Sequence, residues 1–580
     1  MEAPARGLDR SSWVAELRSR PRTVGLVLQA LSMTAGAALL IWLLRDTPYV
    51  ADEWLLMTRA QGWDLNGILE PWNGHLLAVG QLLARISLHT VGTSYTLLVA
   101  LDIAGVLACS ALVYVFARRR IGPILAVVPA MVPLFFSGTS AYYGTGIQFT
   151  PLMGINGVFS LDFGLAALLL LEERRRSRDL AAALMLTLSL ASFSYGLAFA
   201  VGCGVAVGLA PRWRHRAWAV AVPLALYGAW RLFATVHWHA EAGAITAEHV
   251  ALSPFYLGDA FAASTAGYFG LAQMIGRGPS IQLLTTPAFA SLSLPLVLLV
   301  SELVLFLWIG RRLGREGLLR ASLWPPLATL VAMWGSQALV MDPIARMPGD
   351  PRYLFAGAVL IAVVFSELAR GIRLSRFAIV AVFAIAITGA IANLPRFREG
   401  KAANDTVLAK SRITGAVFEI AGDGIDPDYN PAVELPDVGG PMFISAGVFR
   451  AFAESNGSLA SMSPAELLEQ SPDLRSDADR LLADATRLRL RPALAPPQRA
   501  QCVRIGPDAT LSPTPGRIWL SSPSRAGVVM YRFADEPVVE LGRVSGRSWQ
   551  TLTIPPDRLP NLLWHLGSSG PGAIDACRLP

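Results

Sequence analysis

The sequence predicts an α-helical, polytopic membrane protein of about eleven transmembrane helices, followed by an α+β or β-sandwich domain outside the membrane. Of its 580 residues, 53% are hydrophobic and only 16% are charged, and the mean hydropathy is +0.46. A soluble globular chain usually carries about a quarter charged residues. Apolar runs of membrane-spanning length recur up to residue 394, and charges, proline and glycine return from about Arg396. These observations separate a membrane part from a soluble tail.

The basic charge lies in the membrane part. The formal net charge is +7, from 49 basic and 42 acidic residues. Residues 1–395 hold 29 basic against 21 acidic residues, whereas the tail holds 20 and 21. Most of these basic residues are arginines that flank the apolar runs. They therefore predict membrane loops and no nucleic-acid partner. Only Lys401 and Lys410 are lysines, a bias typical of GC-rich bacterial genomes, so we expect a bacterial plasma membrane.

Eleven apolar runs are candidate membrane spans, because a helix crosses the bilayer with about 20 residues, or fewer where neighbours bury its ends. The first run follows the arginine-rich segment 1–22 without a small-residue cleavage site, so we expect it to be retained. The short fifth and sixth runs meet at Ser192 to Gly196, which predicts a hairpin below the outer surface. The predicted spans are 23–45, 95–117, 121–138, 151–171, 179–193, 195–210, 217–235, 286–309, 321–341, 353–371 and 376–394.

Arginine placement predicts the orientation, since cytoplasmic loops retain basic residues. With segment 1–22 in the cytoplasm, the inner segments hold 22 arginines and the outer loops hold five. An odd number of spans then places the domain 396–580 outside the cell. If an apolar stretch of the long outer loops 46–94 and 236–285 crossed the membrane, the arginine distribution would no longer fit. We therefore expect helices in these loops to lie along the outer membrane surface. The five outer arginines are Arg59, Arg85, Arg277, Arg346 and Arg352.

The tail predicts helices followed by strands. Residues 402–421 and 463–490 favour helices, the second opening at Ser463-Pro464 with a cap and an N1 proline. Four β-prone runs follow: GRIWLSS, GVVMYRF, PVVELGRV and SWQTLTI. Cys502 and Cys577 lie in this tail. A disulfide between them and two separate thiols both fit the sequence.

An acidic pair directly follows the first span. The segment from Tyr49 to Trp54 places Asp52 and Glu53 at the outer membrane surface. Acids so close to hydrocarbon are costly unless they are hydrated, paired or functional. An ordinary helix start, with Asp52 as N-cap and Glu53 in the first turn, explains the same pattern. Both interpretations stay open at this point.

A second group of polar residues precedes the tenth span. The short outer loop before it carries Arg346 and Arg352 and ends in Tyr353. A guanidinium suits a lipid phosphate, because it offers a planar fork of donors and keeps its charge. Anchoring of arginine and tyrosine at the membrane interface is the alternative.

These features together resemble the GT-C glycosyltransferases, polytopic enzymes that take sugars from polyprenyl-phosphate carriers on the outer side of the membrane. The resemblance rests on the Asp52-Glu53 pair, the long first outer loop, the Arg352-Tyr353-Leu354 motif and the external tail. It covers roughly residues 20–395. It implies a GT-C-like catalytic domain over 23–395, with Asp52 as catalytic base and Glu53 as its neighbour or substitute.

The residue chemistry is compatible with such a transfer. An inverting transfer needs one carboxylate to take the proton of the acceptor hydroxyl. The leaving polyprenyl phosphate departs as an anion and needs only positive charge, for which Arg346, Arg352 and Tyr353 are the candidates. The expected partners are a polyprenyl-phosphate-linked sugar, the lipid bilayer, and an acceptor that is a cell-envelope glycan, a glycolipid or a protein.

Other residues have weaker signals. His237 and His239 have the ligand type for a divalent cation, but their spacing without a fixed partner is a weak metal signal, so the sequence establishes no cofactor. Other candidates also have an ordinary explanation: a hydrated loop histidine for His75, which the sequence favours, and an aromatic belt for Tyr143 and Gln148. These candidates for substrate contact are Arg59, His75, Tyr143 and Gln148.

Two other function classes stay open. A transporter or lipid flippase would place polar groups near the bilayer midplane and often has two repeated halves. The candidate residues here lie at the outer surface and no repeat is evident, which favours the enzyme. A non-catalytic envelope-assembly protein, whose tail recruits a partner, is the third class.

Overall fold

The computed structural model describes two compact units. The helical unit comprises Met1–Arg45, Gly62–Arg85 and Thr96–Asn404, and the tail unit comprises Asp46–Gln61, Ile86–Tyr95 and Asp405–Pro580. The predicted first outer loop, 46–94, is therefore divided between the two units. The described residues are 21–47, 49, 52–136, 151–173, 175–238, 244–271, 320–341, 346–435, 442, 444–457, 462–507, 509–546 and 548–580.

The helical unit is a multi-pass membrane region. Within the described ranges, five helices are long and apolar enough to cross a membrane, and two shorter apolar helices accompany them. Helices occupy ten of the predicted spans, whereas the span 286–309 lies outside the described residues. The five long helices are α2 (Pro21–Leu44), α6 (Thr96–Ile121), α8 (Pro151–Glu172), α11 (Trp218–Trp238) and α18 (Arg376–Ala421), and the two shorter ones are α10 (Tyr195–Gly208) and α17 (Pro351–Leu368).

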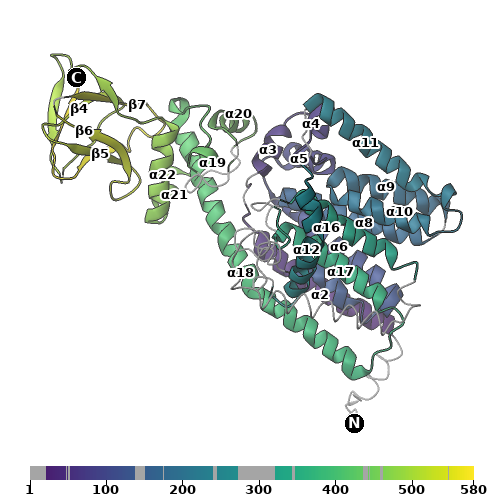
Figure 1. The fold of residues 1–580 in the computed structure, drawn as a ribbon. Coiled ribbons are helices and arrows are strands. Elements are labelled where there is room, and N and C mark those ends of the chain that lie inside the picture. Colours follow the sequence, from purple (N-terminus) through teal and green to yellow (C-terminus); the bar gives the residue numbers. More distant parts are fainter. Residues whose placement is uncertain are drawn as a thin grey trace, which may run out of the picture. The chain divides into compact units, whose positions relative to one another are not determined.

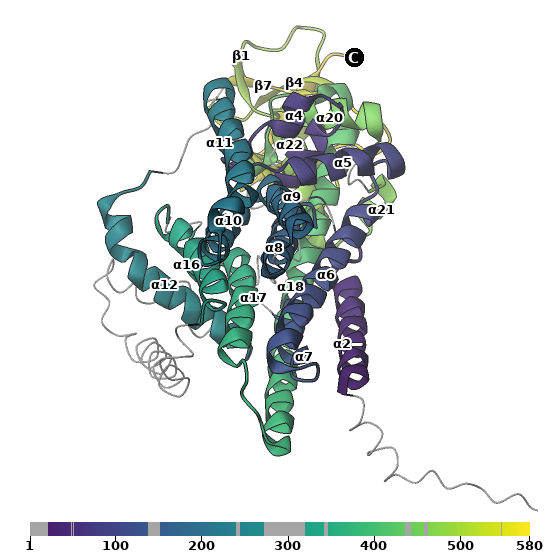
Figure 2. The ribbon, with the colours of Figure 1, turned by 90° about the vertical axis from the view of Figure 1, so that its right-hand side faces the viewer.

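These helices pack side by side around one apolar core (Figure 1). Helix α8 lies between α6 and α9 (Arg176–Ser192), and α10 packs against α16 (Trp324–Ala338). Helix α2 runs beside α6 and α7 (Val127–Phe135) (Figure 2). Glycine permits that approach, because a Cβ at Gly25 would lie 2.4 Å from the carbonyl oxygen of Pro123.

One end of the helical unit, which we call the arginine-rich end, carries a buried charge cluster. Arg120 of α6 ion-pairs with Glu367 of α17 and with Glu172 of α8, and the side chains of Arg120 and Glu367 are 2% and 0% exposed. Glu367 also accepts hydrogen bonds from Arg370 Nη2 at 2.9 Å and from Ser322 Oγ at 3.2 Å. Buried charges are tolerated when they are paired and hydrogen-bonded. The cluster therefore holds three helix ends together.

Two predicted spans differ from the helices found. The described helix in 121–138 is α7, whose nine residues extend only about 14 Å; turns at Gly122 to Ala126 delay its start. The last span does not end at residue 394, because α18 runs through Pro395 to Ala421 and has 46 residues in all. Its residues to Asn404 belong to the helical unit and those from Asp405 to the tail unit.

Helices occupy both long loops that the sequence predicts outside the membrane. The first loop contains α3 (Asp52–Arg59), α4 (Leu65–Leu69) and α5 (Ala78–Val91), and the second contains α12 (Ala247–Gly267). Thr246 caps α12 by accepting a hydrogen bond from His249 N at 3.1 Å, so this helix starts at Ala247. We expected helices in both loops, and the structure has them.

The tail unit begins with helices. After α18 come α19 (Pro431–Glu434), α20 (Ala446–Asn456), α21 (Pro464–Leu468) and α22 (Pro472–Ala485). The predicted start at Ser463 is a full capping box with Glu466. The aspartates Asp423 and Asp426 in this region ion-pair with Arg450 and Arg487.

In the described part of the tail, nine strands then form two antiparallel sheets (Figure 1). One sheet has the order β1-β7-β4-β9-β2 and the other β3-β8-β5-β6. All four β-prone runs are strands, and the prediction of a β domain is confirmed. The strands are β1 (Arg491–Ala493), β2 (Gln501–Ile505), β3 (Thr510–Leu511), β4 (Gly516–Ser521), β5 (Ala526–Tyr531), β6 (Val539–Val544), β7 (Trp549–Ile554), β8 (His565–Ser569) and β9 (Ile574–Arg578).

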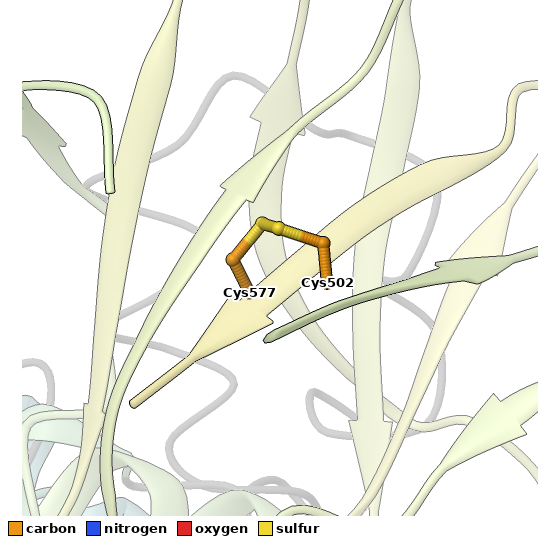
Figure 3. The surroundings of a disulfide bond; sticks show 2 residues. All are labelled: Cys502 and Cys577. Atoms are coloured by element: carbon orange, nitrogen blue, oxygen red, sulfur yellow. A yellow bond between two sulfur atoms is a disulfide. The ribbon is translucent and has the colours of Figure 1, made fainter. Parts of the chain in front are cut away.

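A disulfide joins the edge strand β2 to β9. Cys502 and Cys577 face each other in the antiparallel register and are bonded (Figure 3). Of the two possibilities that the sequence left open, the structure has the disulfide. Such a bond is stable in an oxidising compartment. Cys109 and Cys203 are buried free thiols in the helical unit.

Candidate functional site

The acidic pair opens α3. Asp52 and Glu53 both lie in the first turn of this helix, where carboxylates interact favourably with the helix dipole. Asp52 is thus the first helical residue, and not the cap before it. The two side chains differ in exposure, since Asp52 is half-buried and Glu53 is 0% exposed. One carboxylate is thus partly exposed and its neighbour is enclosed.

Aromatic rings hold this helix within the tail unit. Trp54 is 0% exposed, and its ring lies 6.2 Å from that of Tyr49 and 5.7 Å from that of Phe449 on α20. The ring of Tyr49 lies 4.2 Å from that of Tyr95, and its hydroxyl donates to Thr93 O at 3.4 Å. Burial, and then the charge of Glu53, raises the pKa of Tyr49. Tyr49 therefore stays a neutral hydroxyl beside the acidic pair.

The middle of the first loop, residues 62–85, belongs to the helical unit and is organised by a buried arginine. Arg85 of α5 is 0% exposed. Its Nε donates to Gly62 O at 2.7 Å, and its Nη1 donates to Gln81 Oε1 at 2.6 Å. Trp230 Nε1 of α11 donates to Leu69 O at 2.8 Å. This part of the loop is thus fastened by polar contacts.

His75 lies at a tight turn of that loop. Asn73 and Gly74 have φ of 46° and 77°, and backbone hydrogen bonds of 3.0 and 2.8 Å join Trp72 and His75. Such positive φ values are typical of a two-residue Asn-Gly turn. The ring of His75 lies 4.7 Å from that of Phe193, at the junction of α9 and α10. The histidine thereby joins the first loop to the predicted hairpin.

We call the loop before α17 the arginine loop; its described residues are 346–350. Arg346 is half-buried, and its Nη1 donates to Val340 O at 3.4 Å. Asp350 is 6% exposed and accepts from Met347 N at 3.2 Å. Tyr353, in the first turn of α17, is 9% exposed. Arg352 lies in the same turn, and its side chain is outside what the structure describes.

The remaining candidates divide into two groups. Arg59 is half-buried in the last turn of α3, in the same unit as the acidic pair. His237 is exposed and stacks on Phe233, with ring centroids 4.7 Å apart. In the described ranges, no three His, Cys, Asp or Glu side chains group as metal ligands. Three candidates lie outside the described residues: Tyr143, Gln148 and His239.

An apolar cavity of about 530 Å³ lies between α7, α12, α17 and α18 in the helical unit. Its lining on α17 begins at Ala362, about 14 Å along the helix from Tyr353. It is therefore separate from the arginine loop. Asn393 adds an amide to its wall and donates to Phe135 O at 3.1 Å and Gly267 O at 3.0 Å. Other lining residues are Val128, Tyr268, Phe365 and Ile385.

Two residues that contribute to the candidate site went unrecognised in the sequence. Phe449 packs on Trp54, but nothing in the pattern around it distinguishes it from other apolar helix residues. The sequence singles out Arg85 only as one of the five arginines of the predicted outer loops. A lone arginine on an otherwise apolar helix face is, however, a recognisable sign of a buried anchor.

The structure is similar to two solved membrane proteins. ArnT from Cupriavidus metallidurans, bound to undecaprenyl phosphate, has 12% identity over 78% of this chain and 90% of its own, with a TM-score of 0.39. The archaeal oligosaccharyltransferase AglB from Archaeoglobus fulgidus, in complex with an inhibitory peptide and a dolichol-phosphate, has 14% identity over 69% of this chain and 58% of its own, with a TM-score of 0.33. The likeness is distant. The sequence matches no protein-family model, and a search of curated proteins finds no match.

Proposed function

We propose that the protein is an integral-membrane, inverting glycosyltransferase of the GT-C type. It moves a sugar from a polyprenyl-phosphate carrier to a glycan, glycolipid or protein on the outer face of the membrane. The observation that carries this proposal is the acidic pair at the start of α3, with a half-buried Asp52 beside a fully buried Glu53. The pair follows the first apolar helix, which ends at Leu44.

Asp52 is the catalytic base in this proposal. Its carboxylate takes the proton of the acceptor hydroxyl as the oxygen attacks the anomeric carbon and the bond to phosphate breaks. The electron pair of that bond leaves on the carrier phosphate. No acid is needed for this departure, because the phosphate is a stable anion. Glu53 is enclosed, so it serves as the neighbour of the base.

Positive charge stabilises the leaving phosphate. Arg346 and Arg352 carry guanidinium groups that can bind phosphate through two parallel hydrogen bonds, and Tyr353 adds a hydroxyl. Alignment of donor and acceptor supplies much of the remaining rate.

The test is sugar transfer by the purified full-length protein, with polyprenyl-phosphate sugars and candidate acceptors. Asp52→Asn should lower kcat by about 10²–10⁴-fold, the usual contribution of a general base. Asp64→Asn is the matched control, because Asp64 lies in the same loop and caps α4 through Gly67 N at 2.7 Å. Equal rates for wild type and Asp52→Asn would remove Asp52 from the reaction. Absence of transfer with every donor would favour a transporter or an assembly protein.

A further inference from the structure

Helix α3 depends on its neighbours for its position. It has only eight residues, and an isolated helix of this length is not stable in water. Tertiary packing must therefore keep it folded and orient its first turn. Any group that fixes the helix also fixes Asp52.

The main described partner of α3 is α20 in the C-terminal part of the tail unit. Trp54 of α3 and Phe449 of α20 are 0% and 1% exposed, and their ring centroids lie 5.7 Å apart at an interplanar angle of 51°. The ring of Phe449 lies 5.4 Å from that of Phe418 near the end of α18. Phe449 thus bridges the acid-bearing helix to the long helix that enters the tail.

The helix geometry leaves Asp52 on another face. Successive residues of an α-helix are rotated by about 100°, so Asp52 and Trp54 lie about 160° apart around the axis. The difference in exposure agrees, because Asp52 is half-buried whereas Trp54 is fully buried. The aromatic contact therefore lies on the face of α3 opposite to Asp52, whose side chain is only half-buried.

Helix α20 is itself fixed in position by a cap, backbone hydrogen bonds and an ion pair. Ser445 caps it, and its first backbone N–H groups, those of Ala446 and Gly447, donate to Tyr429 O at 2.9 Å and Pro427 O at 2.8 Å. Further along, Arg450 ion-pairs with Asp423 at 2.8 Å. A shift of the segment 423–429 would thus move α20 and, through Phe449, the helix α3 that carries Asp52.

We infer that Phe449 is a positioning residue for Asp52, and that the C-terminal chain belongs to the catalytic unit of the enzyme. The inference rests on the proposed function. It assigns the tail a role in catalysis, since the tail supplies the packing surface that orients the base. Removing that surface misplaces the carboxylate, and a misplacement of about 1 Å can lower a rate about 100-fold.

The experiment compares Phe449→Ala with Phe452→Ala in the full-length protein. Phe452 lies one turn further on α20 and is also 1% exposed, and in the described part of the chain no ring contact joins it to α3. Both variants remove the same side chain from the same helix. Hydrogen exchange of the backbone amides in 52–59 reports on α3 directly, and sugar transfer reports on Asp52.

Phe449→Ala should speed exchange in 52–59 more than Phe452→Ala does, and should lower kcat about 100-fold with the donor KM nearly unchanged. Phe449→Leu should recover most of the loss. Adding Asp52→Asn to Phe449→Ala should lose no more turnover than Asp52→Asn alone, because both changes act on one group.

Equal exchange of α3 in the two alanine variants would overturn the inference, and so would equal losses of turnover. If the wild type transfers no sugar from any donor, the proposed function fails separately. The exchange comparison then decides alone whether the tail orients α3.

Discussion

The arginine-rich end and helix α3 both bury charged side chains, but the contacts that fasten the helices in the two regions are of different kinds. At the arginine-rich end, the 0% exposed side chain of Glu367 is paired with Arg120 and Arg370. On α3, Glu53 is equally buried, while the ring contacts of Trp54 fasten the helix. At the arginine-rich end, ion pairs hold the helices together. On α3, aromatic ring contacts of Trp54 hold the helix that carries Glu53.

This difference predicts that variants at the arginine-rich end lower the stability of the fold, whereas variants of Asp52 lower activity. Removing a charge at the arginine-rich end leaves its buried partner uncompensated, so the fold is weakened. Replacing the half-buried Asp52 on α3 removes a chemical group and leaves the aromatic contacts in place. Charged residues beside apolar helices look alike in sequence, yet their packing assigns them different roles.

The largest stability loss is expected for Arg120→Gln. Among the described residues, the substitution leaves Glu367 buried with the part-exposed Arg370 and Ser322 as its partners. Breaking a buried ion pair on one side typically costs about 3–5 kcal/mol. Thermal unfolding of the purified protein in detergent should show a clearly lowered midpoint, whereas the remaining folded protein should keep its turnover.

The double variant Arg120→Gln with Glu367→Gln is the control for that prediction. Removing both charges also removes the uncompensated carboxylate, so it should be more stable than Arg120→Gln alone. A double variant that unfolds at or below the midpoint of the single variant would show that the pair is not held by charge.

A smaller loss is expected for Asp479→Asn on α22, a third kind of buried acid. Asp479 is 0% exposed and accepts from the backbone N–H groups of Arg532, Phe533 and Ala534 at 2.9 to 3.0 Å. Loss of its charge weakens three hydrogen bonds between α22 and the end of β5, which should cost about 2 kcal/mol. Hydrogen exchange in 526–534 measures the effect. Asp477→Asn on the same helix, where the acid is partly exposed, should change exchange little.

The sequence predicted elements well where the signal is local. The β-prone runs of 516–554 are strands β4 to β7, and the Ser463 start is a capping box. Strand β2 was missed, because its side chains are exposed at four successive positions and show no alternation. Its place is instead fixed by pairing with β9 and by the disulfide.

The candidate site was predictable in its residues but not in their neighbours. Asp52 was singled out because it is an acid next to hydrocarbon, a local signal. Its packing depends on Phe449, and the ion pair of Arg120 joins residues 247 positions apart. One sequence carries no pairing information at such separations. It also did not predict that the first loop divides between two units at Gly62 and Arg85.

The smallest effect concerns a charge network near the surface of the tail unit. Arg487 Nε donates to Asp426 Oδ2 at 2.7 Å and Arg487 Nη2 donates to Glu434 Oε1 at 3.1 Å, and these bonds lower the pKa of both carboxyls. A lowered folded-state pKa adds stability above the ordinary values of 3.8 and 4.5, and this stability is lost as the pH falls through the folded-state values. Because the three side chains are partly exposed, the contribution should be about 0.5–1 kcal/mol. Arg487→Gln should therefore lower the unfolding midpoint slightly at pH 7 and reduce the further fall on acidification below about pH 4.5. An unaltered acid response in this variant would show that other carboxyls account for it.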